Sequence, residues 1–317
     1  PQPRRLVERL YGADAAAYGE PAAPDVDLEQ LAATLPMTEW LAEKATACVA
    51  HSPFYADRLR RACPGPVAVL PLAYDGRSVP TGSSGHSRSR LRLLTVGHVN
   101  ENKQVHRVIE TLASSVALRE RYRYDIVGAI EPAMRLRLER LIDDCDLAQS
   151  VSIVGPVSDA VLQDYLRDAD VVASLRWPAL EGASASTIEG MLAGKPVIVT
   201  DVGFYRTLPE ECVLRVRPDH IDEDLASHLV RLGPDDDART RLGRDARAWA
   251  KAEFSAERYA ERFEQLLSAA VPAAVNAVAV RQVASLLVGF GVSADDPLVG
   301  HVGDEMTTLL STGVQQD

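Results

Sequence analysis

The segment 180–201 reads LEGASASTIEGMLAGKPVIVTD, and its character changes halfway along. The first half is rich in small and hydroxyl residues and predicts a loop that runs into a helix over 186–193. The second half, after Gly194-Lys195-Pro196, is a run of β-branched residues that predicts a buried strand over 196–202. A helix followed by a buried strand is one unit of an alternating α/β chain.

The same alternation extends on both sides of this segment. Apolar runs that suit strands buried on both faces alternate with helical stretches, which predicts right-handed βαβ units. The predicted strands cover 91–97, 124–128, 151–155, 171–175, 196–202 and 213–215, and the predicted helices cover 104–115, 132–145, 159–167, 186–193 and 221–232. The fold class is therefore α/β, with a Rossmann-like parallel sheet.

The flanking sequence predicts a domain division. Residues 1–75 have helical composition and only two short strand-like runs, too few for an independent sheet domain. Residues 76–90, GRSVPTGSSGHSRSR, are typical of a linker. The sheet domain then covers 91–252, and 253–317 form a helical tail. Predicted helices in the flanks cover 5–19, 27–35, 37–44, 54–61, 236–251, 255–268, 271–290 and 295–310.

Composition restricts the partners and the compartment. The net charge of −11, from 34 basic and 45 acidic residues, argues against a nucleic-acid partner. The four cysteines are scattered without metal-ligand spacing, which indicates reduced thiols and a cytoplasmic protein. No run approaches the roughly 20 apolar residues of a membrane span, which leaves only peripheral membrane contact open.

The candidate binding residues gather after the predicted strands. Glu181 and Glu189 bracket a small, hydroxyl-rich helix start, where backbone N–H groups suit a phosphate and carboxylates suit sugar hydroxyls. Ligands of open parallel sheets bind beyond the carboxyl ends of the strands, where Gly97, Gly128 and Gly155 also lie. This combination predicts a nucleotide-sugar site.

The order of the motifs then resembles a known family. LLTVGHVNENKQVHRVIETL at 93–112, IVGAIEP at 126–132, VSIVGPVSDAVLQDYLRDADVVASL at 151–175, the E-x7-E pair and Gly194-Lys195-Pro196-Val197 resemble the donor-binding domain of retaining GT-B glycosyltransferases. The resemblance covers about 45–265. It implies transfer of a sugar from a nucleotide diphosphate sugar to an unspecified acceptor, with retained configuration and with no metal or other cofactor.

The resemblance also implies roles for the central segment. Glu181 would contact the transferred sugar, and Glu189 would accept from the ribose hydroxyls; the alternative is a pair of solvated glutamates beside a helix start. Ser184, Ala185, Ser186 and Thr187 stand where the family has a turn whose amides meet the diphosphate. Their hydroxyls could bind phosphate or serve as helix N-caps, and the two roles are compatible.

Further positions match the family less uniformly. Lys103 matches a lysine that neutralises the leaving diphosphate, close to the Gly97 turn. In that family an arginine commonly precedes this lysine by five residues, and in this chain His98 stands at that position. Either Arg176 or a protonated His98 compensates, or stabilisation of the leaving group is weaker. Gly155 and Val157 stand where the family backbone meets the nucleotide base.

Other functions remain open at this level. The resemblance places 1–75 at the end of an acceptor domain, and the chain starts at Pro1 without a methionine, so we expect further sequence upstream. A non-catalytic nucleotide-sugar binding or docking module fits the same motifs. A nucleotide-sugar epimerase of this fold would need extra acid–base groups, and a dinucleotide oxidoreductase would need a GxGxxG after the first strand.

Overall fold

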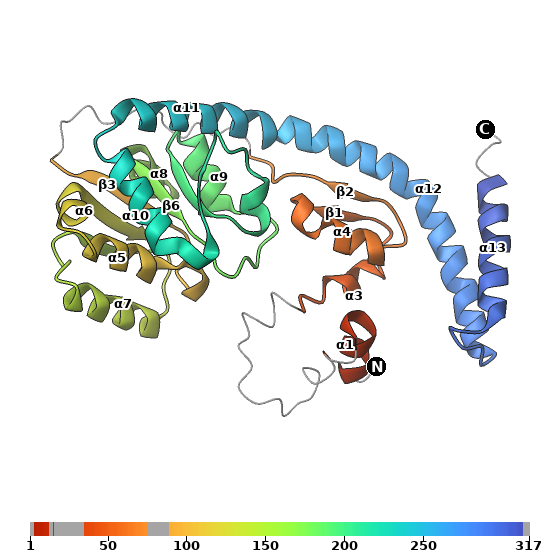
Figure 1. The fold of residues 1–317 in the computed structure, drawn as a ribbon. Helices are drawn as coiled ribbons and strands as arrows, with labels where there is room; N and C mark the ends of the chain where they lie inside the picture. Colours follow the sequence, from red (N-terminus) through yellow and green to blue (C-terminus); the bar gives the residue numbers. More distant parts are fainter. Residues whose placement is uncertain (1–2, 13–14, 16–34, 75–88, 313–317) are drawn as a thin grey trace.

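A computed structural model of the chain describes residues 3–12, 15, 35–74 and 89–312. Its main body is a six-stranded, all-parallel sheet with the strand order β5-β4-β3-β6-β7-β8 (Figure 1). The strands are β3 (Leu91–Val96), β4 (Tyr122–Val127), β5 (Val151–Gly155), β6 (Val171–Ser174), β7 (Val197–Thr200) and β8 (Leu214–Val216). The strand order reverses between β3 and β6, as in a Rossmann-like sheet, which confirms the predicted fold class.

Helices cover both faces of this sheet, which explains why its central strands are apolar on both sides. One face carries α5 (Val105–Ala113), α6 (Val116–Arg121), α7 (Pro132–Asp144) and α10 (Ile221–Leu232). The other carries α8 (Asp159–Asp168), α9 (Ala185–Leu192) and α11 (Asp236–Glu253). All residues of β6 and β7 are buried. The hydrophobic core is therefore two apolar layers, one on each side of the sheet.

The N-terminal residues form a small unit beside the sheet domain (Figure 1). It consists of α1 (Pro3–Tyr11), α3 (Thr38–Ala42), β1 (Cys48–Ala50), α4 (Pro53–Ala62) and β2 (Val67–Val69). The two strands pair in parallel, in register from Cys48 with Val67. The Tyr74 N–H donates to the Phe254 carbonyl at 2.7 Å, which joins this unit to the end of α11.

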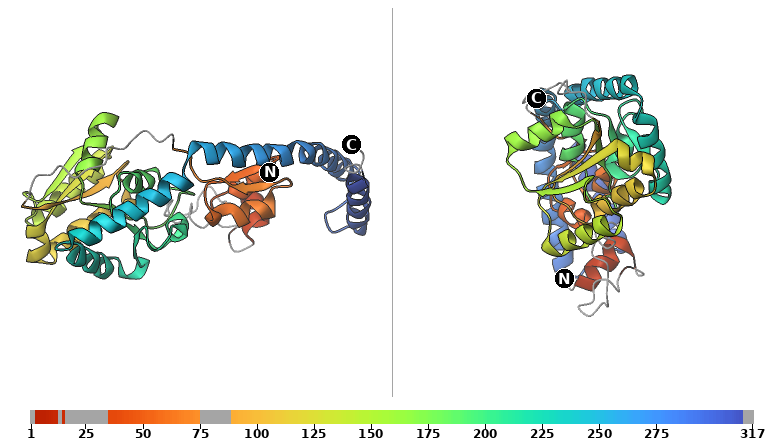
Figure 2. Two further views of the ribbon diagram at one scale, coloured as in Figure 1. Left: turned by 90° about the horizontal axis from the view of Figure 1, so that it is seen from above. Right: turned by 90° about the vertical axis from the view of Figure 1, so that its left-hand side faces the viewer.

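The C-terminal part is more continuous than the sequence predicts. Helix α12 (Ala256–Gly289) runs without interruption through the two helices that the sequence predicts over 255–268 and 271–290, with Pro272 inside it. It extends past the N-terminal unit, and α13 (Pro297–Thr312) folds back beside its far end (Figure 2). Arg281 on α12 donates to the Ala45 carbonyl at 3.5 Å, so α12 also touches the N-terminal unit.

Helix α12 also corrects the expectation that no segment approaches the length of a membrane span. It contains an 18-residue window of mean hydropathy 1.6, of which 6% is buried, and within the described residues it is the one helix of this kind. By length and composition alone it could cross a membrane. The core helix of a soluble protein passes the same test, so this is weak evidence for a span.

Other sequence expectations meet the structure in different ways. The predicted helix 104–115 is α5, followed after Ser114 and Ser115 by the separate helix α6, which the sequence did not predict. The predicted helix over 27–35 and the linker over 76–90 fall almost entirely outside the described residues. The domain boundaries at 75, 90 and 252 therefore stay a prediction.

Candidate functional site

The predicted site residues lie at the carboxyl edge of the sheet, on loops that β3 and β6 bring together. Lys103 belongs to a 3-10 turn, η2 (Glu101–Lys103), after β3, and Arg176 to Glu181 follow β6. Because β3 and β6 are adjacent strands, the two loops meet. The Trp177 N–H donates to the Asn102 carbonyl at 2.7 Å, and the Gln104 amide donates to the Trp177 carbonyl at 3.2 Å.

The carboxylate of Glu181 is held by two buried donors. Arg176, which is 4% exposed, donates from Nε to Glu181 Oε1 at 2.9 Å. The hydroxyl of Tyr205 donates to the same oxygen from the turn η3 (Gly203–Thr207) after β7. Burial of Tyr205 raises the pKa of its hydroxyl, so that the hydroxyl remains a donor. Charge-assisted bonds of this kind fix the orientation of the carboxylate.

The ammonium group of Lys103 is buried at the centre of the site. Lys103 is 6% exposed and donates from Nζ to the Val96 carbonyl. The pKa of Lys103 is lowered to about 7, chiefly by burial and then by the charge of Arg176, while Glu181 and Glu189 act in the opposite direction. These effects place one more cation and two carboxylates within electrostatic range of Lys103.

Gly97 makes room for this lysine. Its φ of +101° lies in the left-handed region, and a Cβ at this position would lie 2.6 Å from Lys103 Nζ. The neighbouring Gly128, with φ of +144°, packs so closely that its Cβ would lie 2.1 Å from the Gly97 carbonyl oxygen. Both glycines therefore allow the loops after β3 and β4 to approach each other beneath the site.

Glu189 lies on α9 and is half-buried. Burial raises the pKa of Glu189, Asp159 raises it further, and Lys103 opposes both. Tyr74 of the N-terminal unit lies within range of the same carboxylate: burial raises the pKa of Tyr74, and the charge of Glu189 adds to the effect. The N-terminal unit therefore contributes to the surroundings of Glu189.

The hydroxyl groups at the start of α9 do not cap the helix. Ser184 occupies the N-cap position of α9, yet its side chain makes no capping hydrogen bond. Its Oγ lies 3.3 Å from Ser186 Oγ, and Ser186 accepts from Arg176 Nη2 at 3.4 Å. The first N–H groups of α9, at the exposed Ala185 and beyond, therefore have no side-chain cap and suit an anion.

The structure contradicts a phosphate-binding role for the Thr187 hydroxyl. Thr187 is fully buried, and its Oγ1 lies 2.7 Å from Ser174 Oγ at the end of β6. Successive residues of an α-helix point in different directions. The Thr187 side chain therefore faces the sheet, while that of Ser186 faces Arg176. It anchors α9 to β6.

The remaining predicted residues lie at the end of β5 or just after β3 and β5. His98 is exposed, and the described residues show no hydrogen bond to its ring. The Gly155 carbonyl accepts from the Gly128 N–H at 2.8 Å, which ties the ends of β4 and β5 together. The side chain of Val157 packs against the α8–α9–α11 apolar layer, so a ligand at this position would meet its backbone.

Sequence reasoning missed the part played by Tyr205 and by Tyr74. The Tyr205 hydroxyl is 24 positions from its acceptor Glu181, so no local spacing connects the two residues. An aromatic hydroxyl directly after a buried strand, at the ligand-binding edge, was the available signal. In the part of the chain that the structure describes, no group of three or more His, Cys, Asp or Glu side chains could hold a metal ion.

Comparison with known proteins identifies the family. Residues 82–249, more than half of the chain, match the model of the glycosyl transferases group 1. The chain belongs to the group 1 glycosyltransferases. No curated protein matches it in sequence. The match spans the whole sheet from β3 to β8 and almost all of α11, so it includes every residue of the candidate site except Tyr74.

Solved structures show the fold of this group 1 glycosyltransferase. Sucrose-phosphate synthase from Thermosynechococcus elongatus is similar with a TM-score of 0.64 and 24% identity, over 78% of this chain. HepE from Anabaena, in complex with UDP, is similar with a TM-score of 0.65 and 19% identity, over 77% of this chain and 70% of its own. The chain spans 63% of the length of the synthase. The shared architecture is GT-B.

Proposed function

We propose that this chain carries the donor site of a retaining glycosyltransferase that takes a nucleotide diphosphate sugar. The observation that carries the proposal is the convergence of Lys103, Arg176 and the open start of α9 on the carboxylate of Glu181. Buried cations and free helix N–H groups stabilise a diphosphate, and a fixed carboxylate accepts from sugar hydroxyls. Solved HepE structures hold UDP or UDP-glucose, which makes UDP-glucose the first donor to test.

The proposed chemistry places positive charge where the leaving group becomes more negative. As the bond between the anomeric carbon and the diphosphate breaks, the sugar gains oxocarbenium character and the diphosphate gains charge. Lys103 and the N-terminus of α9 would stabilise that charge more strongly than they stabilise the bound donor, which lowers the barrier. Glu181 would orient the sugar, and a departing phosphate oxygen on the same face would take the acceptor proton.

Glu189 supports the nucleotide part of the proposal. Its position on the second turn of α9 sets it one helix turn beyond the proposed diphosphate position, where the ribose hydroxyls would follow. Gly155 and the backbone at Val157 would then meet the base. We also propose a cytoplasmic location, which the four free cysteines support, because disulfides form in oxidising compartments.

Calorimetric titration with UDP-glucose and other nucleotide sugars tests the donor site. We expect a measurable affinity for at least one donor, a loss of about tenfold or more in Lys103→Ala, and a comparable loss in Glu189→Ala, because each removes a charged hydrogen bond. Lys251→Ala, an exposed lysine on α11, is the matched control and should bind as the parent chain does. Absence of binding to every nucleotide sugar would overturn the proposal.

A second candidate function is a non-catalytic nucleotide-sugar binding module. It is favoured by the exposed His98, which stands where the family has an arginine, and by the engagement of Arg176 with Glu181. Donor binding by calorimetry, together with neither hydrolysis nor transfer of the donor sugar by the protein, would favour this module. Turnover of the donor would exclude it.

A further inference from the structure

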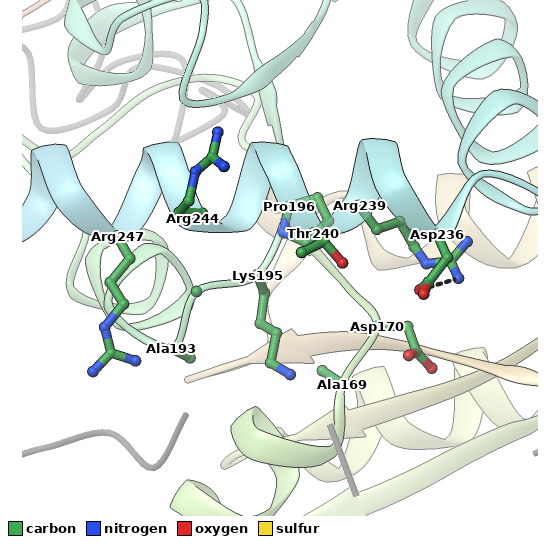
Figure 3. Close-up of a pocket in the computed structure, with 11 residues that line it drawn as sticks. Ala169, Asp170, Ala193, Lys195, Pro196, Asp236, Arg239, Thr240, Arg244 and Arg247 are labelled. Atoms are coloured by element: carbon green, nitrogen blue, oxygen red, sulfur yellow. Dashed lines mark hydrogen bonds and ion pairs between the residues drawn. The ribbon is translucent and has the colours of Figure 1, made fainter. Parts of the chain in front are cut away.

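The amino edge of the sheet, opposite the candidate site, holds a cavity whose polar groups do not converge. It has a volume of about 390 Å³ and lies between α11 and the turn after α9 (Figure 3). Lys195 and Arg247 lie on either side of Ala193, and Lys195 donates to the Arg167 carbonyl at 2.7 Å. Polar groups from two units of the chain converge instead at the carboxyl edge, where the N-terminal unit meets Glu181.

The first turn of α4 brings two aromatic rings to this edge. Phe54 and Tyr55 pack edge to face, with their ring centroids 4.6 Å apart. The Phe54 ring lies against Gly203 at the start of η3, because a Cβ on that glycine would lie 3.3 Å from Phe54 Cε1. The Tyr55 ring lies against Gly182, because a Cβ there would lie 3.6 Å from Tyr55 Cδ2. The N-terminal unit therefore touches the loop that carries Glu181.

The hydroxyl of Tyr55 is a donor that the described part of the chain does not use. Tyr55 is half-buried, and its hydroxyl makes no hydrogen bond with any described residue. Burial raises the pKa of this hydroxyl, against the charge of Arg58, and the charges of Glu181 and Glu39 add to the rise. The hydroxyl thus stays protonated and lies within electrostatic range of Glu181.

Glu181 offers a matching acceptor. The two donors that hold it, Arg176 Nε and the Tyr205 hydroxyl, both bind its Oε1 atom. Its Oε2 atom accepts no hydrogen bond from the residues that the structure describes, and its side chain is 32% exposed. An ionised carboxylate oxygen of this kind is a strong acceptor for a hydroxyl group. Oε2 is therefore the atom of Glu181 that a ligand hydroxyl would meet.

The N-terminal unit holds Tyr55 in place through a chain of polar contacts. Arg58 lies one helical turn along α4 and pairs with Glu39 of α3 at 3.3 Å. Glu39 in turn accepts from the hydroxyl of Tyr11, on α1, at 2.7 Å, and the Arg58 guanidinium lies 6.0 Å from the centroid of the Tyr11 ring. Three helices of the unit are thereby tied together around the turn that carries Tyr55.

The N-terminal unit places one tyrosine beside each carboxylate of the E-x7-E pair. Tyr55 lies within electrostatic range of Glu181, and Tyr74 lies within range of Glu189. Glu181 and Glu189 mark the sugar end and the ribose end of the proposed donor. A tyrosine at the sugar end can pack its ring against the apolar face of a pyranose and donate its hydroxyl to a sugar oxygen.

We propose that Tyr55 contacts the transferred sugar and helps to determine which sugar the site accepts. The inference rests on the proposed donor site. Glu181 Oε2 would accept from one sugar hydroxyl, while the Tyr55 hydroxyl would bond a second one and the ring would cover an apolar face. A sugar that lacks the second hydroxyl, or carries a substituent that meets the ring, would bind less tightly. Discrimination between sugars would then depend on the N-terminal unit, whereas the sheet domain holds the nucleotide.

Calorimetric titration of the whole chain with a nucleotide diphosphate and with its sugar conjugate isolates this contact. The pairs are UDP with UDP-glucose, UDP with UDP-N-acetylglucosamine, and GDP with GDP-mannose. For a pair that the parent chain binds, we expect Tyr55→Ala to weaken binding of the sugar conjugate about five- to tenfold and to leave the free nucleotide diphosphate unchanged. Tyr55→Phe keeps the ring and should show a smaller loss, again for the conjugate alone.

The matched control is Tyr259→Ala. Tyr259 is a half-buried tyrosine on α12, stacked on Phe263 with 6.0 Å between the ring centroids, and its loss should change neither affinity. If thermal melts show that Tyr55→Ala is unfolded at the titration temperature, Tyr55→Leu, which keeps an apolar side chain, takes its place with the same expected result.

The outcomes separate this inference from the donor site on which it rests. Unchanged affinity of Tyr55→Ala for the sugar conjugate, or an equal loss for the conjugate and the free nucleotide diphosphate, would overturn the role of Tyr55 and leave the donor site in place. Failure of the parent chain to bind any of these ligands would overturn the donor site and the role of Tyr55 together.

Discussion

The pKa of Lys103 links the site to the stability of the fold. In the folded chain burial lowers this pKa to about 7 from the ordinary 10.5. Between these values the unfolded chain binds the proton and the folded chain does not, so the free energy of unfolding rises with pH across that window. Below about pH 7 both states are charged, and the folded chain bears the full cost of the buried charge.

We therefore expect Lys103→Met to remove this pH dependence. Methionine keeps most of the side-chain volume and has no charge to desolvate. Relative to the parent chain, the variant should be most stable below about pH 7 and should lose that advantage as the pH approaches 10.5. Urea unfolding at pH 6, 8 and 10 measures the effect. Lys251→Met, at an exposed position, should show no such trend; parallel curves for both variants would refute the assignment.

The same residue gives a prediction for the donor. A diphosphate beside Lys103 favours the charged ammonium, so binding above about pH 7 must draw a proton from solution. The affinity for UDP-glucose should therefore fall as the pH rises above about 7. Both phosphates of this donor are esterified and lack the ionisation near pH 6 that a phosphate monoester has. Titration in buffers of different ionisation enthalpy measures the proton uptake; no uptake at pH 8 would contradict the role of Lys103.

Tyr205 offers a test of how Glu181 is held. Tyr205→Phe removes one of two donors to Glu181 Oε1 and leaves the ring in the core. We expect the free energy of unfolding to fall by about 1.5–3 kcal/mol, the range for hydrogen bonds to charged groups. A double-mutant cycle with Glu181→Gln should give a coupling energy above about 0.5 kcal/mol. Additive effects would mean that the contact contributes nothing to the position of the carboxylate.

Some residues of the site could be predicted from the sequence and others could not. Glu181, Glu189 and Lys103 could be placed together because the order of strands sets which loops meet, and apolar runs reveal the strands. The bond from Tyr205 and the inward turn of Thr187 could not be foreseen. Both contacts depend on the direction in which a side chain points and on the distance between neighbouring elements, and the sequence gives neither. The same limit hid the contact between Arg176 and Glu181, whose five-residue separation within a loop has no fixed geometry.

At the scale of elements, the backbone of α11 packs very closely against the turn after α9, at Gly194. Gly243→Ala would place a Cβ 1.9 Å from the Gly194 carbonyl oxygen, and two backbones cannot separate without cost. We expect a loss of stability of about 1–3 kcal/mol, as for overpacked cores. Gly289→Ala on α12 is the matched control, because its Cβ meets open space, and it should be neutral or slightly stabilising. Thermal melts of both variants decide; equal melting temperatures would contradict the close contact.

Helices and strands of the sheet domain were predictable because burial on two faces leaves strong apolar runs. The helices of the C-terminal tail, after residue 252, were less predictable. The sequence predicted two helices, over 255–268 and 271–290, yet α12 runs through both, and Pro272 lies inside it although proline disfavours a helix interior. Its neighbours are alanine and valine, which keep the helix going on either side, and α13 packs beside its far end. The break between α5 and α6 was missed because both halves have helical composition.

For the whole molecule, the junction at Phe254 connects three parts. Phe254 is 2% exposed, its ring packs edge-on to Trp249 at 5.4 Å, and its carbonyl accepts from the Tyr74 N–H. It lies between α11 and α12, in the α8–α9–α11 apolar layer. The single chain segment thus fixes the sheet domain, the N-terminal unit and the long helix relative to one another. The surroundings of Glu189 depend on this placement, since Tyr74 comes from the N-terminal unit.

Phe254→Ala should therefore affect both stability and the donor site. Truncation of a fully buried phenylalanine costs about 3–5 kcal/mol, and loss of the ring also loosens the segment to which Tyr74 is bonded. Phe263→Ala is the control, because Phe263 is 38% exposed on α12 and its loss should cost far less. Denaturant unfolding measures the first effect, and UDP-glucose titration below the unfolding transition measures the second. A donor affinity that falls in Phe254→Ala but not in Phe263→Ala would show that Glu189 needs the N-terminal unit in place; equal affinities would mean that the sheet domain alone forms the donor site.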